Sequence, residues 1–248
     1  MNEEATGRFA HIPEPVPANL QDLCEHVKQT GAEIGFAVDP DVDRCAIVGE
    51  TGEPIGEEYT VTLATEFILS KKKGPVAVNI STTRAVDDVA RKFGIEVIRT
   101  PVGEINVAKK MKEIGAVIGG EGNGGVILPD IHLGRDAPVA IALTLQYLIE
   151  TDKTISELWK SLPRYVMTKK KIEIGNSNPD QILEKVKEAH THERLNLIDG
   201  IKIERPDSWV HIRKSNTEPI IRIIAEAKTK EESEDICDNF FKEIEHLL

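Results

Sequence analysis

Val76-Ala77-Val78-Asn79-Ile80 is a short apolar run that opens the most regular part of this sequence. A helical pattern follows over residues 83–93, a short strand over 96–99, a helix over 107–114 and a strand over 116–118. Short apolar strands that alternate with helices are typical of a mostly parallel sheet covered by helices. The sequence therefore predicts an α/β fold with a mixed, mostly parallel sheet and helices on both faces.

The flanking segments extend this pattern, and beyond Pro163 they give way to a different one. We expect helices over 19–30, 59–70, 138–151 and 155–162 and strands over 32–38 and 45–49. After Pro163 we expect strands over 169–174, 209–213 and 220–226 and helices over 179–191 and 230–248. This last region, roughly 80 residues long, has the size of a small independent domain. It predicts a separate α+β C-terminal domain.

An acidic loop, Asp39-Pro40-Asp41-Val42-Asp43-Arg44, lies between the two strands expected before the sheet. A loop at a strand end can aim alternate side chains at one point, and three carboxylates there would suit Mg²⁺ or a similar cation. Arg44 offers a planar fork that suits phosphate. The loop therefore predicts a metal site on Asp39, Asp41 and Asp43 with phosphate chemistry beside it.

Three other interpretations of this loop are open. An EF-hand also begins D-x-D-x-D, but it needs Gly where Arg44 stands and helices on both sides. A solvated acidic turn is the second alternative. The third is a phosphatase that uses Asp39 as its nucleophile.

Composition limits the classes of partner. The chain has 248 residues and a formal net charge of −11, whereas a nucleic-acid-binding protein needs a broad basic surface. No apolar stretch approaches the ~20 residues of a membrane helix. The three cysteines are scattered, which favours a reducing cytoplasm. We therefore expect a cytoplasmic protein that binds neither nucleic acid nor membrane.

Two further loops carry ligand-binding chemistry. The segment 119–125 contains a formal G-x-G-x-x-G, but a strand-like run follows it where a dinucleotide fold needs a helix. Glycines that let a ligand approach the backbone, with Glu121 and Asn123 binding hydroxyls, are the better interpretation. The second loop, 213–219, lies between two strands and can surround a phosphate with hydroxyl, amide and guanidinium donors. Either loop could instead be an ordinary polar turn.

Taken in order, D-x-D-x-D-R, G-E-x-N-G-G and R-x-S-N-T-E-P resemble three motifs of the α-D-phosphohexomutase family, which includes phosphoglucomutase, phosphomannomutase and phosphoglucosamine mutase. Segments 81–84 and 100–103 also look like this family, and the resemblance covers essentially the whole chain. It implies an enzyme that moves a phosphate between the 1- and 6-positions of a hexose through a bisphosphate.

The resemblance also implies roles for individual residues. Asp39, Asp41 and Asp43 would hold Mg²⁺, and Arg44 would contact the transferring phosphate. The sugar would be bound by Glu121, Asn123 and Gly103, and its distal phosphate by Arg213, Ser215, Asn216, Thr217 and Arg222. Implied domains are a remnant of the second domain at 1–54, the third at 55–163 and the fourth at 164–248.

Two departures from the family pattern matter. Many bacterial members have G-E-x-S-G-H where this chain has Asn123 and Gly125, a variant that resembles archaeal members. The general acid/base is therefore unassigned, with Glu104, His132 and Arg135 as candidates.

The second departure is that the nucleophile motif T-A-S-H-N-P does not occur in this sequence. We therefore expect a truncated mutase that is inactive alone and needs a separate N-terminal half, or one that self-associates through its incomplete domain. A non-catalytic phosphosugar-binding module and the Asp39 phosphatase remain as alternatives.

Overall fold

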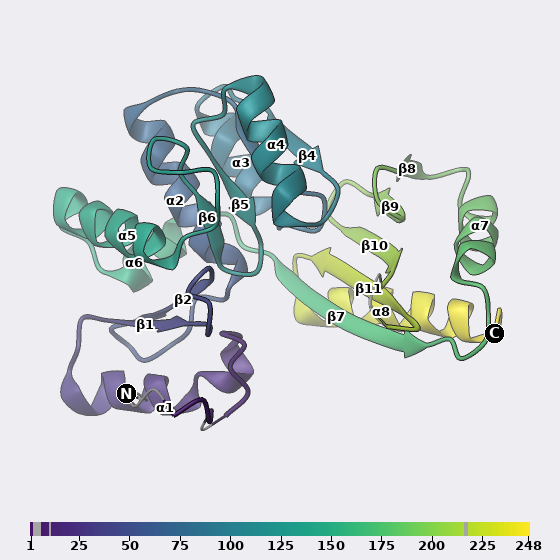
Figure 1. Ribbon diagram of the computed structural model, residues 1–248, viewed down its shortest axis with the longest axis horizontal. Coiled ribbons are helices and arrows are strands. Elements are labelled where there is room, and N and C mark those ends of the chain that lie inside the picture. The colour runs from purple at the N-terminus through teal and green to yellow at the C-terminus, as the bar shows by residue number, and fades with distance from the viewer. Residues whose placement is uncertain (2–5, 10, 216–217) are drawn as a thin grey trace. The chain divides into compact units, whose positions relative to one another are not determined.

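The computed structural model describes residues 1–248 except 2–5, 10 and 216–217 (Figure 1). The chain divides into two compact units, Met1–Pro163 and Arg164–Leu248. Each unit has its own elements and its own apolar core. No helix in the described part of the chain has the length and apolar composition needed to cross a membrane.

The first unit begins with a short hairpin packed on a helix. Its elements are η1 (Pro17–Asn19), α1 (Gln21–Thr30), β1 (Ile34–Val38) and β2 (Cys45–Gly49). The two strands pair antiparallel, and a core of Leu20, Val27, Ala46 and Val48 joins them to α1. The acidic loop connects β1 to β2, so strands flank it, as predicted, and an EF-hand is excluded.

The mixed sheet follows. Its elements are α2 (Glu58–Lys71), β3 (Val76–Asn79), α3 (Ala85–Lys92), β4 (Val97–Thr100), α4 (Glu104–Ile114), β5 (Ile118–Glu121), β6 (Gly125–Ile127), α5 (Ala137–Thr151) and α6 (Ile155–Ser161). The strand order is β4-β3-β5-β6, with β4, β3 and β5 parallel and β6 antiparallel to β5. The prediction of a mixed, mostly parallel sheet is confirmed.

Two consecutive glycines in β5 show that helices cover both faces of this sheet. A Cβ on Gly119 would lie 2.6 Å from Sδ of Met111 on α4, whereas one on Gly120 would lie 3.1 Å from a methyl group of Val61 on α2. Because successive residues of a strand point to opposite faces, α4 and α2 lie on opposite sides of β5. The strand has no side chains at these positions, so both helices pack close to its backbone.

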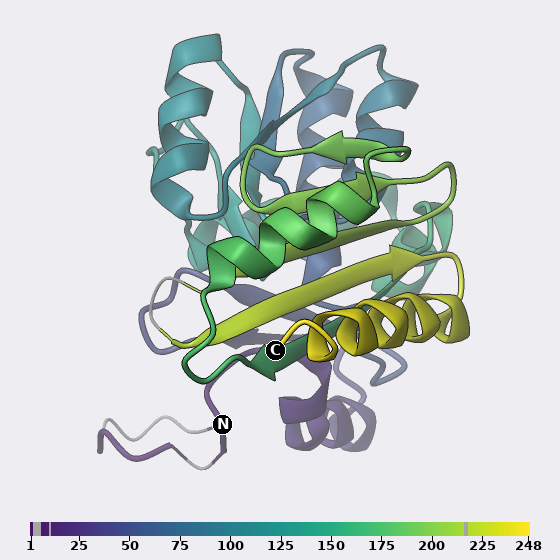
Figure 2. The same cartoon turned by 90° about the vertical axis from the view of Figure 1, so that its right-hand side faces the viewer.

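The second unit is an antiparallel sheet with two helices on one face. Its elements are β7 (Val166–Glu173), α7 (Pro179–Ala189), β8 (Arg194–Asn196), β9 (Ile201–Glu204), β10 (Trp209–Lys214), β11 (Ile220–Ala227) and α8 (Lys230–Glu245), and the strand order is β7-β11-β10-β9-β8. Alternate residues such as Ile221 and Ile223 face a core shared with Val186 of α7 and Phe240 of α8. Figure 2 shows both helices in front of this face. The predicted α+β C-terminal domain is confirmed.

The structure corrects several expected elements. Of the strands expected over 32–38 and 45–49, the first is shorter at its start, and the pair β1–β2 forms a two-stranded sheet of its own. Strands β8 and β9 were not predicted, although Ile201-Lys202-Ile203-Glu204 alternates as a strand should. Helix α4 starts at Glu104 rather than 107 because Gly103 ends the preceding loop at its N-cap.

Replacing Gly120 with Ala should destabilise the first unit strongly. Its φ of +151° disfavours a side chain, and the added Cβ would also clash with the carbonyl oxygen of Gly125. Gly94 is the matched control because its φ is +76° and a Cβ there meets no described atom within 4 Å. We expect Gly94→Ala to cost about 1–2 kcal/mol from backbone strain and Gly120→Ala about 1–3 kcal/mol more from overpacking. Urea unfolding measures both, and equal losses would contradict the packing of β5 on β6.

His211 should make the second unit acid-sensitive. Burial lowers its pKa to about 4, because a cation is disfavoured there even though the ring Nε2 donates a 2.6 Å hydrogen bond to the carbonyl of Asp199. An unfolded histidine titrates near 6.5. Between these values the unfolded chain binds a proton that the folded chain does not, so the free energy of unfolding falls as pH drops from about 6.5 to 4, by ~1.4 kcal/mol per unit.

Above pH 6.5 this group adds no pH dependence. The His211→Gln variant should lose this component when urea unfolding is compared with wild type from pH 4 to 8. Substitution of the exposed His246 by Gln is the control. The same pH dependence in both variants would contradict the assignment to His211.

Candidate functional site

The acidic loop is held by its own first aspartate. Oδ1 of Asp39 accepts hydrogen bonds from the backbone N–H groups of Asp43 (3.1 Å) and Arg44 (3.0 Å). The side chain of Asp39 is buried, and the backbone of Val42 takes a left-handed φ of 58°. These contacts fold the loop back on itself. One oxygen each from Asp39, Asp41 and Asp43 can lie within 4.8 Å of the others.

This donor set fits a metal ion. Three carboxylate oxygens around one point are the hard ligands that divalent cations such as Mg²⁺ or Mn²⁺ prefer. Oδ1 of Asp43 is buried and accepts no hydrogen bond from any residue that the structure describes. A buried carboxylate oxygen normally has a partner, and a cation at the triad would supply one. Asp39, Asp41 and Asp43 could therefore hold a metal.

Arg44 lies across the same carboxylates. Its Nε is 3.3 Å from Oδ2 of Asp39 and 3.6 Å from Oδ1 of Asp43, and its Nη1 is 3.7 Å from a carboxylate oxygen of Glu14. The guanidinium is partly exposed. It is thus placed beside the acidic triad and within reach of solvent, and an anion that arrived at the triad would meet it.

The glycine-rich segment is a tight hairpin, not a phosphate-binding helix start. Residues 119–125 run from β5 through a turn into β6, which excludes the dinucleotide interpretation. Asn123 caps the turn, since its Oδ1 accepts a 3.2 Å hydrogen bond from the N–H of Gly125. The backbone N–H of Cys45 donates to the carbonyl of Gly124 at 3.0 Å, so this hairpin lies directly against the end of the acidic loop.

The side chain of Glu121 is buried, and both of its carboxylate oxygens already accept hydrogen bonds from the protein. The residue is 4% exposed. Its Oε1 accepts hydrogen bonds from Nδ2 of Asn79 (2.7 Å) and from the N–H of Gly103 (3.0 Å). Its Oε2 accepts one from Nη1 of Arg135 at 2.7 Å. The structure thus brings Glu121 and Gly103 together, and a sugar hydroxyl would join an already occupied carboxylate.

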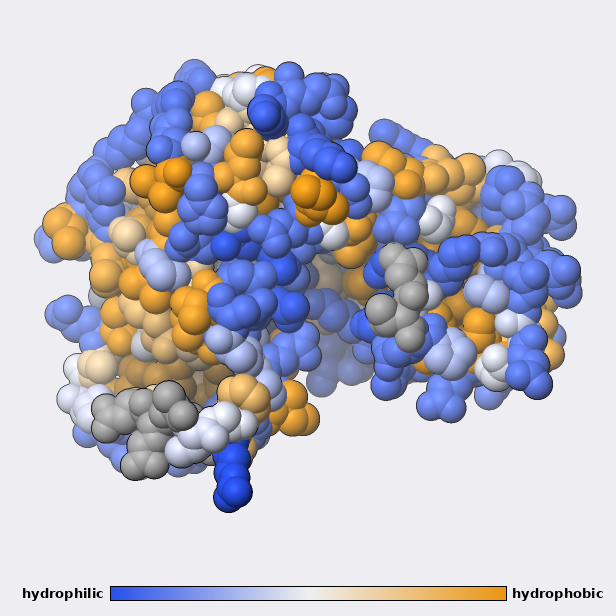
Figure 3. All heavy atoms as spheres, viewed as in Figure 1, coloured by the Kyte–Doolittle hydropathy of each residue, from blue (hydrophilic) through white to orange (hydrophobic). Residues whose placement is uncertain are grey.

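Arg135 bridges the two loops. Besides Glu121, its guanidinium pairs through Nη2 with Asp43, and its Nε lies 3.5 Å from Glu104. The N–H of Arg135 also donates to Glu104 at 2.7 Å. Of the other acid/base candidates, the half-exposed His132 pairs with Asp136 at 2.8 Å. Figure 3 shows hydrophilic side chains gathered on this part of the first unit, beside β2 and below α4.

The polar residues beneath the hairpin were not predicted from the sequence. Asn79 ends β3, and its Oδ1 accepts hydrogen bonds from the N–H groups of Ser81 and Thr82. The hydroxyl of Thr82 accepts from the N–H of Gly122 at 2.9 Å, and the buried Glu58 accepts from the N–H of Thr83 at 3.0 Å. A usable signal existed, because Asn79 is the one polar residue in an apolar strand and stands at its carboxyl end, where α/β folds place ligands.

The second unit carries a row of cations. Arg213 of β10 lies opposite Arg222 of β11, which in turn lies opposite Lys171 of β7. Directly opposed residues share a face, and this face is the one that does not carry α7 and α8. Arg213 is largely buried with its Nε 3.6 Å from Asp199, and Arg222 pairs with Glu218 at 3.1 Å. The hydroxyl of Ser215 accepts from the N–H of Glu218 at 3.3 Å, whereas the predicted Asn216 and Thr217 lie outside the described residues.

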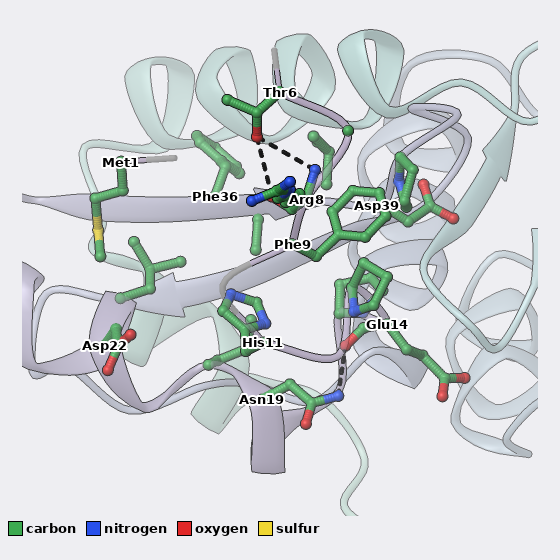
Figure 4. A pocket seen from close by; sticks show the side chains of 18 residues that line it. Met1, Thr6, Arg8, Phe9, His11, Glu14, Asn19, Asp22, Phe36 and Asp39 are labelled. Atoms are coloured by element: carbon green, nitrogen blue, oxygen red, sulfur yellow. Dashed lines mark hydrogen bonds between the residues drawn. The ribbon is translucent and has the colours of Figure 1, made fainter. Parts of the chain in front are cut away.

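A hollow of about 790 Å³ lies between the N-terminal segment and β1 (Figure 4). Apolar rings of Phe9 and Phe36 line it together with Arg8 and Asp39. Neither Asp41, Asp43 nor Glu121 contributes to its wall. The candidate site is therefore identified by its converging polar groups and not by this hollow.

Removing Asp39 should cost stability even without metal, whereas removing Asp41 should not. Asp39→Ala deletes the acceptor of two backbone hydrogen bonds, which we expect to lower the free energy of unfolding by about 1–3 kcal/mol. Asp41 is exposed, so Asp41→Ala should change it by less than about 0.5 kcal/mol. Both variants should bind Mn²⁺ more weakly. Urea unfolding in EDTA and calorimetric Mn²⁺ titration test this, and equal stability of the two variants would refute the role of Asp39.

Comparison with known proteins finds one family over nearly the whole chain. Models of the phosphoglucomutase/phosphomannomutase family match as alpha/beta/alpha domain II over residues 1–52, alpha/beta/alpha domain III over 56–165 and the C-terminal domain over 167–243. Thus all three described loops fall within matched regions.

Two curated relatives are archaeal. A probable phosphoglucosamine mutase of Methanopyrus kandleri is 36% identical over 97% of this chain and 54% of its own length. A phosphoglucomutase/phosphomannomutase of Thermococcus kodakarensis is 37% identical over 100% of this chain and 55% of its own length. The chain therefore spans about half the length of the curated relatives it matches.

Solved structures share the fold. A phosphoglucomutase/phosphomannomutase family protein of Burkholderia thailandensis superposes with a TM-score of 0.81 at 29% identity, over 95% of this chain and 52% of that one. An N-acetylphosphoglucosamine mutase of Aspergillus fumigatus, solved with GlcNAc-6P and magnesium, superposes with a TM-score of 0.64 at 15% identity. The match covers 89% of this chain and 52% of that one. The latter likeness concerns the fold alone.

Proposed function

Because the chain belongs to the phosphoglucomutase/phosphomannomutase family, we propose that it carries the metal, sugar and distal-phosphate sites of a phosphohexomutase. Its substrate is a phosphorylated hexose, and the reaction served is interconversion of hexose 1-phosphate and 6-phosphate through a bisphosphate. Residues 1–54, 55–163 and 164–248 are proposed as the corresponding parts of its second, third and fourth domains.

One observation carries the proposal. The acidic loop (39–44) and the Glu121 hairpin (119–125) lie far apart in the sequence, and they are joined by the Cys45–Gly124 backbone hydrogen bond and by Arg135. Three carboxylates suited to a cation therefore stand next to a carboxylate and an amide suited to sugar hydroxyls. A phosphosugar is the ligand class that needs both.

Each residue has a distinct proposed task. Asp39, Asp41 and Asp43 would hold Mg²⁺, and a cation held there would supply positive charge to neutralise the transferring phosphoryl group. Arg44, already beside the triad, binds that phosphoryl group. Glu121, Asn123 and Gly103 orient the sugar.

The remaining proposed residues bind the phosphate that does not react. These are Arg213, Ser215, Asn216, Thr217 and Arg222. Arg213 and Arg222 are opposed across β10 and β11, so two cations can serve one dianion. The binding energy of this remote phosphate positions the reacting end, which is how binding contributes to rate.

The chain is proposed to be inactive by itself. Transfer to and from the hexose needs a nucleophile, and the family's T-A-S-H-N-P serine does not occur in the 248 residues. A separate N-terminal half, or a second copy, is the proposed macromolecular partner. A cytoplasmic location is part of the same proposal, in keeping with three free cysteines.

The phosphatase alternative is disfavoured by geometry. One oxygen of Asp39 accepts two backbone hydrogen bonds, and the other lies 3.3 Å from Arg44. A carboxylate so engaged is a poor nucleophile. A non-catalytic phosphosugar-binding module would use the same residues, and it differs in showing no turnover when the missing half is added.

The first experiment is calorimetric titration of mannose 1-phosphate and glucose 6-phosphate in Mg²⁺. Arg213→Ala should weaken binding by about 10–100-fold, the equivalent of a lost hydrogen bond between charged groups. Lys214→Ala is the matched control, since its side chain pairs with Asp180 on the opposite face of the sheet and it should bind as wild type does.

No binding by wild type, or equal binding by all three proteins, would contradict the proposal. Turnover of a hexose 1-phosphate by the pure chain would contradict its predicted inactivity.

A further inference from the structure

Arg135 is one of the candidates for the general acid/base, but it lies outside the three motifs of the sequence. It lies in the loop before α5 with its side chain 11% exposed. One guanidinium nitrogen pairs with Asp43 of the acidic loop and another with Glu121 of the Glu121 hairpin, residues 119–125. A single side chain thus holds one residue from each of two binding loops.

The packing around Arg135 is specific. A Cβ on Gly125 would clash with Cδ of Arg135 and lie 2.9 Å from its Cγ. Gly125 has no left-handed φ, so its backbone does not itself require glycine. The absence of a side chain at position 125 is therefore explained by the space that Arg135 fills.

The charges around Arg135 also indicate a specific role for an arginine at this position. Asp43, Glu121 and Glu104 all lie within ion-pair distance of this guanidinium. A buried carboxylate is costly unless it is paired. The planar fork of arginine offers separate N–H groups to two carboxylates, which a lysine ammonium on a flexible stem does not fix in direction. Arg135 pairs with Oδ2 of Asp43, while Oδ1 lies 3.6 Å from Nε of Arg44 and accepts no hydrogen bond from a described residue.

We propose that Arg135 is a positioning residue that fixes Asp43 for metal binding and Glu121 for sugar binding, and so couples the two loops. This inference rests on the proposed function. Groups that orient metal ligands through a hydrogen bond are typically worth 10–100-fold in metal affinity. The removal of Arg135 should therefore weaken metal binding, even though it also removes a positive charge near the cation.

The test is calorimetric titration of Mn²⁺ into the full chain, without substrate, followed by titration of glucose 6-phosphate at saturating Mn²⁺. Arg135→Met should raise the Mn²⁺ dissociation constant by about 10–100-fold and weaken glucose 6-phosphate as well. Arg135→Lys should fall between it and wild type. Arg205→Met is the control, because it also removes an arginine that is paired with a carboxylate, here a bidentate pair with Glu193 in the second unit, and it should leave Mn²⁺ binding unchanged.

A double-substitution cycle separates positioning from general damage. Gly125→Ala should weaken Mn²⁺ binding because it displaces Arg135, and it should have no further effect in the Arg135→Met background. If Arg135→Met does not fold, as judged by circular dichroism, Gly125→Ala and Arg135→Lys carry the test with the same expectations.

The outcomes are distinct. Wild-type Mn²⁺ affinity in the Arg135 and Gly125 variants, or tighter binding, would overturn the positioning role and leave the proposed function standing. Additive effects of the two substitutions would also overturn it. Failure of wild type to bind Mn²⁺ would overturn the proposed function and this inference together.

Discussion

A carboxylate removed from water must be paired, and the first unit is organised around one such carboxylate. Glu121 is almost fully buried, and it is satisfied by an amide from β3, a backbone N–H at the start of α4 and the guanidinium of Arg135. These partners come from three different connections of the sheet. Each connection is therefore held to the others through one side chain, at the edge where the parallel strands end.

The close approach of the two hairpins depends on missing side chains. Gly119 and Gly120 let α4 and α2 pack against β5, and Gly124 reaches the backbone of Cys45. A Cβ at position 124 would lie 2.7 Å from the carbonyl oxygen of Cys45, so the acidic loop and the Glu121 hairpin could not lie this close if Gly124 carried a side chain. Packing that looks like simple core formation thus also sets the distance between the groups proposed to bind metal and sugar.

The sequence allowed much of the fold and the members of the site to be predicted, because both follow from local patterns. Alternating strands and helices indicated the mixed sheet, and D-x-D-x-D between apolar runs indicated the acidic triad. Bonds across long stretches of chain could not be predicted. Arg135 meets Asp43 across 92 positions, and no motif marks either as the other's partner. Glu121 was recognised by residue type, yet its burial among protein donors depends on Asn79 and Gly103, which lie far from it in sequence.

The β1–β2 ribbon is stabilised by its contacts with neighbouring elements. Within the described residues β1 pairs with β2 alone, and a two-stranded ribbon is marginal in water by itself. Strand β2 is anchored to the rest of the unit by Cys45, whose N–H and carbonyl bond Gly124 and Thr60, while β1 rests on α1. Local opening should therefore begin at β1 and leave β2 in place. In such a partly open state Asp43, next to β2, would stay in place, whereas Asp39, next to β1, would move away. The three aspartates would then no longer surround one point, although the rest of the unit would still be folded.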